Sequence, residues 1–347
     1  MPLMTRLMTG RPDPSVPSTP EAGTPPLPDE FAFIRRHFLA LAGPAALGLT
    51  DDAAIFTPEP GRELVIAADA MVEGVHFLSD DPPDTIGRKL LRANLSDIAA
   101  MGARPFGWLL TLACPGRAAD PRFSEAWFSA FADGLAEDQR LFGLSLLGGD
   151  TTSTRGPLVL SLTILGDVAP GQALRRNGAR DGDGLWVTGT IGDGALGLKV
   201  LLGDLPDQNG WLAGRYRLPS PRLGLHLAGI AHAAMDVSDG LVQDAGHLAR
   251  ESGLSVTIDA DAVPLSAAAK AAGSREDLLA LCLTGGDDYE LLLAVPDNQA
   301  RTLQTQCAAA NVSVTRIGRF NAGAGEVYVS RADGTVFPLE RQGWSHF

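Results

Sequence analysis

The stretch Leu64-Val-Ile-Ala-Ala-Asp69-Ala-Met-Val-Glu-Gly-Val-His76-Phe77 decides the fold that we expect for this chain. It begins with a short apolar run, which predicts a buried strand from Leu64 to Asp69. An aspartate, a glycine turn and a histidine follow at the point where the strand leaves the core. Open α/β folds bind ligands at the carboxyl ends of strands, so this segment predicts an α/β protein with a polar site at a strand end.

Length, charge and cysteine content narrow the class of protein. The sequence has 347 residues, is 45% hydrophobic and carries a net charge of −13, which favours two globular domains and argues against nucleic acid as a partner. No apolar run reaches about 18 residues, so no membrane partner is expected. The three cysteines have no paired spacing, which indicates neither disulfides nor a zinc site and favours a cytoplasmic location. Residues 1–28, rich in Pro, Ser, Thr and Gly, are expected to form a disordered tail.

Aspartates recur at expected strand ends and helix starts: Asp52, Asp69, Asp97, Asp150, Asp236 and Asp239. Each one alone has an ordinary explanation as a turn residue or a helix cap. Asp97, however, falls inside a largely apolar expected helix over 85–103, on the same face as Asn94. A buried carboxylate without a partner costs several kcal/mol, so Asp97 is expected to be paired or to bind a metal. Together the aspartates predict phosphoryl transfer with several Mg²⁺ ions.

Two common nucleotide-binding motifs do not account for this chemistry. No lysine stands in the Gly-x4-Gly-Lys-Ser/Thr context of a P-loop. Residues 192–197 fit Gly-x-Gly-x-x-Gly after an expected strand, but a loop over 203–210 follows instead of a second strand that ends in an acid. We therefore interpret Gly197 as a packing residue within a helix.

The order of apolar runs predicts two mixed α/β domains, over 29–166 and 167–347. In the first domain we expect the acidic pair Asp51-Asp52 to lead directly into a short strand that ends at residue 56. We also expect a strand over 144–147 that ends in the block Gly-Gly-Asp-Thr-Thr. In the second domain we expect a helix over 221–233.

These blocks carry a family resemblance over residues 30–347. The chain resembles thiamine-monophosphate kinase, of the superfamily that includes aminoimidazole ribonucleotide synthetase and selenophosphate synthetase. The resemblance rests on Asp51-Asp52-Ala-Ala, Val72-Glu-Gly-Val-His76-Phe, Asn94-Leu-Ser-Asp97-Ile-Ala-Ala-Met-Gly-Ala103, Gly148-Gly-Asp-Thr-Thr152, Arg175-Arg176, Asp236-Val-Ser-Asp-Gly-Leu241 and Gly285-Gly-Asp-Asp-Tyr-Glu-Leu291.

The resemblance implies an α/β (α+β) fold of the aminoimidazole ribonucleotide synthetase type and a homodimer whose N-terminal sheets pair. It implies ATP-dependent phosphorylation of thiamine monophosphate to thiamine diphosphate by direct in-line transfer, with no residue assigned as a general base. The implied Mg²⁺ ligands are Asp52, Asp69, Asp97, Asp150, Asp236 and Asp239. The implied ATP contacts are Gly149, Asp150, Arg176 and Ser238, and the implied substrate contacts are His76, Asp287 and Trp344.

The chain departs from the family pattern in two places. Thr50 stands where the family usually has glycine, and Ala67 and Ala68 stand where it usually has hydroxyl residues. Hydroxyl ligation of a metal is therefore lost at 67 and 68. Two alternatives remain open: a sister enzyme that uses ATP on another acceptor, and a catalytically silent protein that binds thiamine phosphates.

Overall fold

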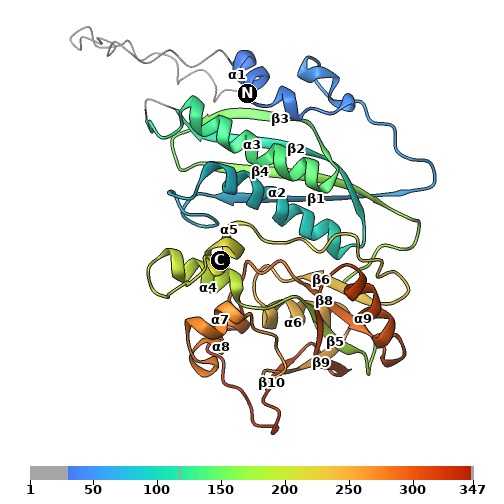
Figure 1. The fold of residues 1–347 in the computed structure, drawn as a ribbon. Helices are drawn as coiled ribbons and strands as arrows, with labels where there is room; N and C mark the ends of the chain where they lie inside the picture. Colours follow the sequence, from blue (N-terminus) through green and yellow to red (C-terminus); the bar gives the residue numbers. More distant parts are fainter. Residues whose placement is uncertain (1–29, 117–118, 345–347) are drawn as a thin grey trace, which may run out of the picture.

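Two β-sheets organise the chain (Figure 1). The computed structural model describes residues 30–116 and 119–344, so the expected tail over 1–28 lies outside the described residues. One sheet has the strand order β1-β4-β2-β3 and the other the order β10-β7-β9-β5-β8-β6. Each sheet contains parallel and antiparallel neighbours and is packed with helices. The prediction of two mixed α/β units is thereby confirmed.

The first unit contains, in chain order, α1 (Glu30–His37), the 3-10 turns η1 (Leu39–Leu41) and η2 (Pro44–Leu49), β1 (Glu63–Val72), α2 (Pro83–Ala100), β2 (Arg104–Pro115), α3 (Glu125–Phe142), β3 (Ser145–Thr154) and β4 (Val159–Val168). The second unit contains β5 (Gly184–Thr188), α4 (Asp193–Leu201), α5 (Trp211–Arg217), β6 (Ala233–Asp236), α6 (Leu241–Glu251), β7 (Leu254–Asp259), α7 (Ala267–Ala272), α8 (Arg275–Thr284), β8 (Leu291–Val295), η3 (Asp297–Gln299), α9 (Ala300–Ala309), β9 (Val314–Ala322) and β10 (Val327–Ser330).

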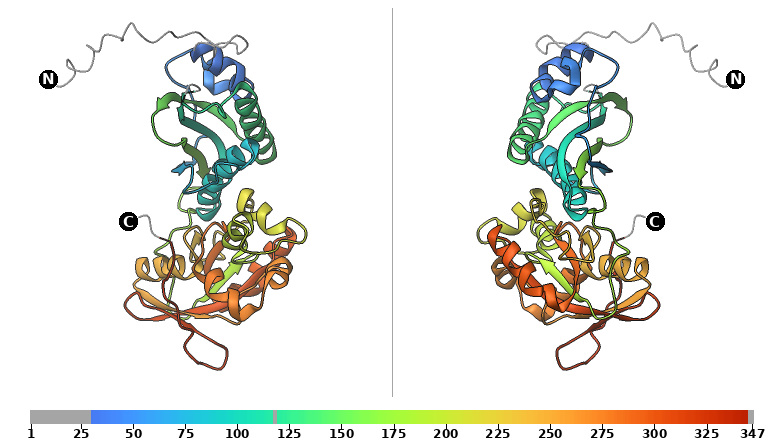
Figure 2. Two further views of the ribbon diagram at one scale, coloured as in Figure 1. Left: turned by 90° about the vertical axis from the view of Figure 1, so that its left-hand side faces the viewer. Right: turned by 90° about the vertical axis from the view of Figure 1, so that its right-hand side faces the viewer.

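Helices α2 and α3 cover one face of the four-stranded sheet, and the other face is open along the described part of the chain (Figure 2). Strand β4 alternates buried and partly exposed residues, as expected for a sheet with one covered face. The open face carries large apolar side chains, with Leu64, Ile66 and Leu109 exposed by 45%, 62% and 37%. These exposed apolar side chains lie on the face of the sheet that the described helices leave open.

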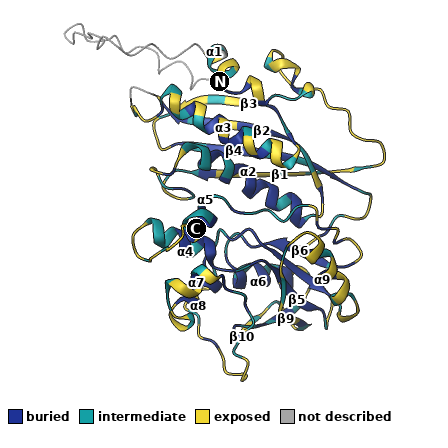
Figure 3. Ribbon diagram, viewed as in Figure 1, coloured by how far each residue is buried: buried dark blue, intermediate teal, exposed yellow. Residues whose placement is uncertain are grey.

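The six-stranded sheet is covered on both faces, which is visible as a buried layer in Figure 3. Every residue of β8 is buried. Leu292 and Ala294 pack with α6 and α8, whereas Leu291, Leu293 and Val295 pack with α9 and with the last turn of α2. The uninterrupted apolar run of β8 follows from this double cover. Helix α2 packs on the first sheet and also reaches the second, so its side chains lie where the two units meet.

Four local predictions are wrong. The strand expected to be buried over 64–69 forms as part of β1 but is mostly exposed, because β1 lies at an edge of its sheet and one face of that sheet is open. Residues 50–56 contain no strand and are mostly exposed. The strand expected over 144–147 continues as β3 to Thr154, because β2 offers it a parallel partner along that whole length. The helix expected over 221–233 is absent, since Gly224 and Gly229 both adopt a left-handed φ of +76°, which interrupts helical geometry.

Candidate functional site

One cavity lies between the two units and has a volume of about 430 Å³. Its lining includes most of the residues that the sequence analysis singled out, which come from β1, α2, β6, the loop before β5, the loops after β6 and α8, and the C-terminal segment. These residues are Asp69, His76, Asp97, Arg176, Asp236, Ser238, Asp239, Asp287 and Trp344. Segments distant in sequence therefore meet in a pocket of the size that binds small molecules.

Carboxylates gather on the side of the pocket where β1, α2 and β6 converge. Asn94 fixes β1 against α2: its side-chain oxygen accepts the N–H of Asp69 at 3.1 Å, and its amide donates to Leu90 O at 2.9 Å. Asp97 lies one turn further along the same helix and donates a hydrogen bond to Asp69. The predicted shared face of Asn94 and Asp97 therefore contacts the predicted strand-end aspartate.

These carboxylates hold protons more tightly than isolated ones. Burial, together with the charges of Asp236 and Asp69, raises the pKa of Asp97 to about 8, although the charge of Arg176 opposes this rise. Burial also raises the pKa of Asp236 to about 6, with a contribution from Asp69. The pKa of Asp69 is raised mainly by burial as well. Carboxyl groups crowded in this way gain most from a cation, which would stabilise their charged forms.

Asp244 holds the loop that carries Ser238 and Asp239. Its Oδ2 accepts the backbone N–H groups of Ser238, Asp239 and Gly240, each at 3.1 Å, and its side chain is buried. Sequence reasoning missed this residue. The available signal was an aspartate in the first turn of the helix that follows the loop, where a carboxylate meets unpaired N–H groups.

The pocket lining also contains His76, Asp287 and Trp344. The Nδ1 atom of His76 accepts the N–H of Val72 at 3.0 Å, so the proton of the neutral ring lies on Nε2. The backbone N–H of Trp344 donates to Asp239 O at 2.9 Å, which connects the C-terminal segment to the loop that carries Ser238 and Asp239. The Trp344 residue remains 46% exposed.

Three of the predicted site residues do not line this pocket. Asp52 lies in an exposed bend after η2, and Gly149 and Asp150 lie within β3, at the distal edge of the first sheet. A Cβ at Gly149 would stand 1.8 Å from Leu110 O, so the tight pairing of β3 with β2 requires glycine there. The glycine signal at 149 thus has a structural cause within the sheet.

The strand register separates Asp150 from the pocket within one chain. Asp69 and Gly149 occupy one row across the sheet, three strand spacings apart, which is about 14 Å. Asp150 pairs with exposed Thr111 and faces the open side of the sheet. Asp69 lies two residues before buried Met71 in β1, so both side chains face the helix-covered side.

The structure also shows where the three residues that depart from the family pattern lie. Ala68 precedes Asp69 in β1 and therefore points to the opposite, open face, while Ala67 shares the face of Asp69 and packs against the core. The Thr50 hydroxyl donates to Leu47 O at 2.8 Å, which gives it a local structural role.

Within the Gly-x-Gly-x-x-Gly motif, Gly194 lines the pocket and Gly197 packs between helices. Gly197 lies in α4, and a Cβ there would stand 2.1 Å from Leu212 O of α5. The prediction of a packing role for Gly197 is confirmed.

Among residues 30–116 and 119–344, no helix is long and apolar enough to span a bilayer.

A Mg²⁺ requirement can be tested against the donor set. The described residues contain no ready-made group of three or more His, Cys, Asp or Glu ligands around one point. Mg²⁺ is normally held by one or two carboxylates together with water and substrate phosphates, so a complete protein cage is not needed. The crowded carboxyl groups of Asp69, Asp97 and Asp236 are hard oxygen donors and fit this ion.

Comparisons with known proteins agree with this geometry. The family model described as AIR synthase related protein matches over residues 50–168 with its N-terminal domain and over 180–330 with its C-terminal domain. A thiamine-monophosphate kinase of Caulobacter vibrioides is 45% identical over 329 residues, which cover 92% of this chain and 91% of that protein.

Solved structures give the same result. The thiamine-monophosphate kinase from Stenotrophomonas maltophilia K279a has a TM-score of 0.78 and 41% identity, covering 89% of this chain and 98% of that one. A structure described as AaThiL complexed with AMPPCP and TMP has a TM-score of 0.72 and 31% identity, covering 86% and 91% of the two chains. The chain therefore belongs to the thiamine-monophosphate kinase family of AIR synthase related enzymes.

Proposed function

We propose that this chain transfers the γ-phosphoryl group of ATP to the phosphate of thiamine monophosphate, giving thiamine diphosphate and ADP. The observation that carries the proposal is that the carboxylates Asp69, Asp97 and Asp236 line the same pocket as His76 and Asp287. A relative solved with AMPPCP, an ATP analogue, and TMP supports the same pair of substrates.

Arg176 and Ser238 are the proposed ATP contacts within this pocket, because a guanidinium fork and a hydroxyl both donate to phosphate oxygens. His76 and Asp287 would contact the acceptor. Trp344 would stack beside the cationic thiazolium ring, as an aromatic face favours a cation. These roles would bring the two phosphates that are to be joined into the same pocket.

We propose that Asp69, Asp97, Asp236 and Asp239 hold several Mg²⁺ ions together with the ATP phosphates. Bound Mg²⁺ would neutralise the phosphate charge and orient the γ-phosphoryl group. Phosphoryl transfer depends mainly on positioning and charge stabilisation, so a direct in-line transfer needs no dedicated general base. The phosphate of the acceptor is already an anionic nucleophile, which is consistent with the lack of an assigned base.

Asp52, Gly149 and Asp150 keep their proposed roles only if a second copy of the chain supplies them. All three lie toward the β3 edge or beside it, away from the pocket of their own chain. We propose a homodimer in which the open, apolar sheet faces pack together and the β3 edge of one copy approaches the β1 edge of the other. This arrangement would cover the exposed apolar side chains and bring Asp150 of one copy toward Asp69 of the other.

We propose a first domain over 29–166 for ATP, Mg²⁺ and dimerisation and a second domain over 167–347. This division is supported by a sheet that ends at Val168 and another that begins at Gly184. The proposed cytoplasmic location is supported by Cys114, Cys282 and Cys307, which are all buried and unpaired.

The test is product analysis after incubation with ATP, Mg²⁺ and thiamine monophosphate. We expect equal amounts of ADP and thiamine diphosphate, and neither product when Mg²⁺ is removed with EDTA. Tight binding of thiamine monophosphate without turnover would instead indicate a silent binding protein. Turnover of a different phosphate or acid acceptor, with none of thiamine monophosphate, would indicate a sister enzyme.

A further inference from the structure

Lys89 is a buried cation beside the pocket to which neither the sequence analysis nor the proposed mechanism gives a role. It lies on α2, and its residue is 1% exposed. Burying an ammonium group costs several kcal/mol unless it is well paired, so its surroundings indicate what it does.

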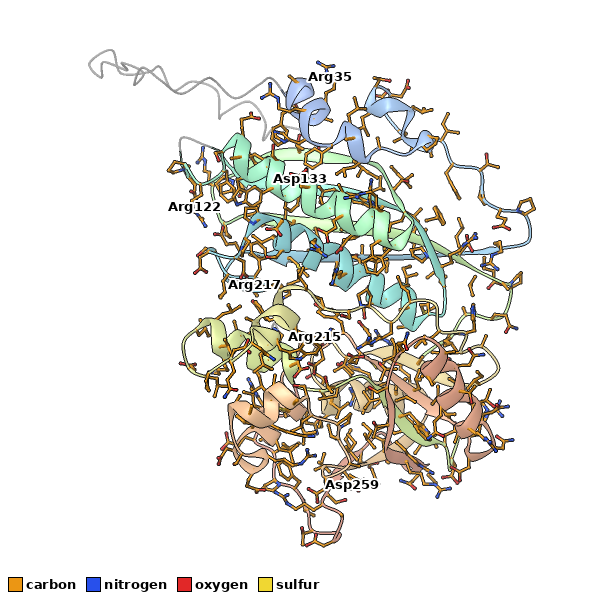
Figure 4. The ribbon with its side chains drawn as sticks, viewed as in Figure 1. Arg35, Arg122, Asp133, Arg215, Arg217 and Asp259 are labelled. Atoms are coloured by element: carbon orange, nitrogen blue, oxygen red, sulfur yellow. The ribbon has the colours of Figure 1, made fainter. Side chains whose placement is uncertain are left out.

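The ammonium group of Lys89 contacts both units of the molecule. It donates to the carbonyl oxygen of His76 at 2.9 Å and to Oδ2 of Asp287 at 2.9 Å. Its Nζ also lies 3.5 Å from the ring centroid of Tyr216, a cation–π contact. Tyr216 belongs to α5, which Figure 4 places at the junction of the units through the labelled neighbours Arg215 and Arg217.

Lys89 joins two of the proposed acceptor contacts, and these two residues come from different units. His76 follows β1 of the first unit, and Asp287 lies in the loop between α8 and β8 of the second. That loop has unusual geometry, because Asp287 and Tyr289 have left-handed φ values of +69° and +51°. Such conformations persist only where surrounding contacts hold them, and Lys89 supplies the contact from α2.

Asp287 has both carboxylate oxygens engaged in this arrangement. Oδ2 accepts from Lys89, and Oδ1 accepts from the hydroxyl of Tyr289 at 3.3 Å. Its backbone N–H donates to Ser238 O at 2.9 Å, which also connects it to the loop that carries Ser238 and Asp239. The carboxylate is thus fixed in direction before any ligand arrives, and preorganisation of this kind raises affinity.

We propose that Lys89 is a positioning residue that sets the distance and orientation of Asp287 relative to His76 and thereby determines affinity for the acceptor. The inference rests on the proposed function, since those two residues are among the proposed acceptor contacts. Lys89 acts through its partners: its own atoms do not line the pocket.

The chain offers a matched control on the same helix. Arg92 is also a buried cation of α2, forms an ion pair with Asp138 and donates to Pro219 O at 3.0 Å. It therefore also connects α2 to the second unit, but its side-chain hydrogen bonds go to Asp138, Leu218 and Pro219, none of which lines the pocket. Lys89→Met and Arg92→Met both remove a buried charge and one cationic partner of a carboxylate, although Asp138 keeps its ion pair with Arg88.

The experiment measures binding of thiamine monophosphate and of AMPPCP with Mg²⁺ by titration calorimetry, together with thermal unfolding. We expect Lys89→Met to weaken thiamine monophosphate binding by about 10- to 100-fold and to change AMPPCP binding by less than about twofold. Arg92→Met should lower the unfolding temperature to a similar degree and leave both affinities unchanged. Lys89→Arg should recover part of the lost affinity.

A double-mutant cycle separates positioning from general stability. If Lys89 acts through Asp287, Lys89→Met combined with Asp287→Asn should bind thiamine monophosphate no more weakly than Asp287→Asn alone. Unchanged acceptor affinity in Lys89→Met, or equal losses for both ligands, would overturn the inference. A wild-type protein that fails to phosphorylate thiamine monophosphate would overturn the proposed function and this inference with it.

Discussion

Mixing two inactive variants should restore activity if each pocket is completed by a second copy of the chain. The variants are Asp97→Asn, which alters the pocket of its own chain, and Asp150→Asn, which alters the open sheet face. Within one chain, Asp150 lies in β3, about three strand spacings or 14 Å across the sheet from the row of Asp69. A carboxylate at that distance cannot share a metal ion with Asp69, so Asp150 would have to serve its partner's pocket.

The size of the effect follows from this geometry. Loss of a metal ligand should cost several kcal/mol of transition-state stabilisation, so each variant alone should fall by more than about 100-fold. After random reassociation half of the dimers are mixed, and each mixed dimer contains one intact pocket and one doubly altered pocket. The mixture should therefore regain about a quarter of wild-type activity.

The assay follows ADP release with thiamine monophosphate as acceptor, first on the reassociated mixture. Mixed dimers purified through two different affinity tags should then show about half of wild-type activity, because one of their two pockets is intact. The matched control mixes Asp97→Asn with Asp236→Asn, because both of these residues line the pocket of the same chain. That control should stay inactive. If the Asp97→Asn and Asp150→Asn mixture also stays at parental activity while native mass spectrometry detects mixed dimers, the shared-pocket arrangement is wrong.

Three further outcomes are expected. Because burial and neighbouring charge raise the pKa of Asp97 to about 8 from 3.8, the folded state binds a proton that the unfolded chain loses, so without divalent cations Tm should fall as pH rises from about 4 to 8. Added Mg²⁺ should raise Tm, more so at the higher pH; a pH-independent Tm would contradict this. Asp244→Ala should lower unfolding free energy by about 3 kcal/mol in urea titrations, since three buried N–H groups lose their acceptor. Gly197→Ala should destabilise the fold by about 1–3 kcal/mol, with KM for ATP unchanged; a large rise in that KM would instead support nucleotide binding at this motif.

The part of the site that the sequence predicts is the part that local pattern determines. An apolar run before Asp69, and a carboxylate on the buried face of a helix at Asp97, each have a physical meaning that needs no knowledge of the fold. The structure brings both into one pocket. The uninterrupted apolar run of β8 also has a local meaning, because such a run requires cover on both faces of its sheet.

The parts that sequence reasoning missed depend on non-local pairing. Lys89 and Asp287 are 198 residues apart, and no helical or strand period links them. The strand over 144–147 was expected to stop at its glycines, yet β2 provides a partner as far as Thr154. Glycine usually interrupts strands, but at Gly149 it permits a close approach to β2 instead. Such outcomes are decided by strand register, which the sequence pattern does not specify for a strand rich in glycine and hydroxyl residues.

The most direct test of the account is a crystal structure grown with AMPPCP, thiamine monophosphate and Mn²⁺ in place of Mg²⁺, with anomalous scattering used to find the ions. The central claim is that carboxylates from β1, α2 and β6 hold cations against the nucleotide phosphates. The account predicts anomalous peaks within bonding distance of Asp69, Asp97 and Asp236, between the nucleotide and an acceptor that contacts His76 and Asp287. Ions or phosphates bound elsewhere, with this pocket holding neither, would contradict it.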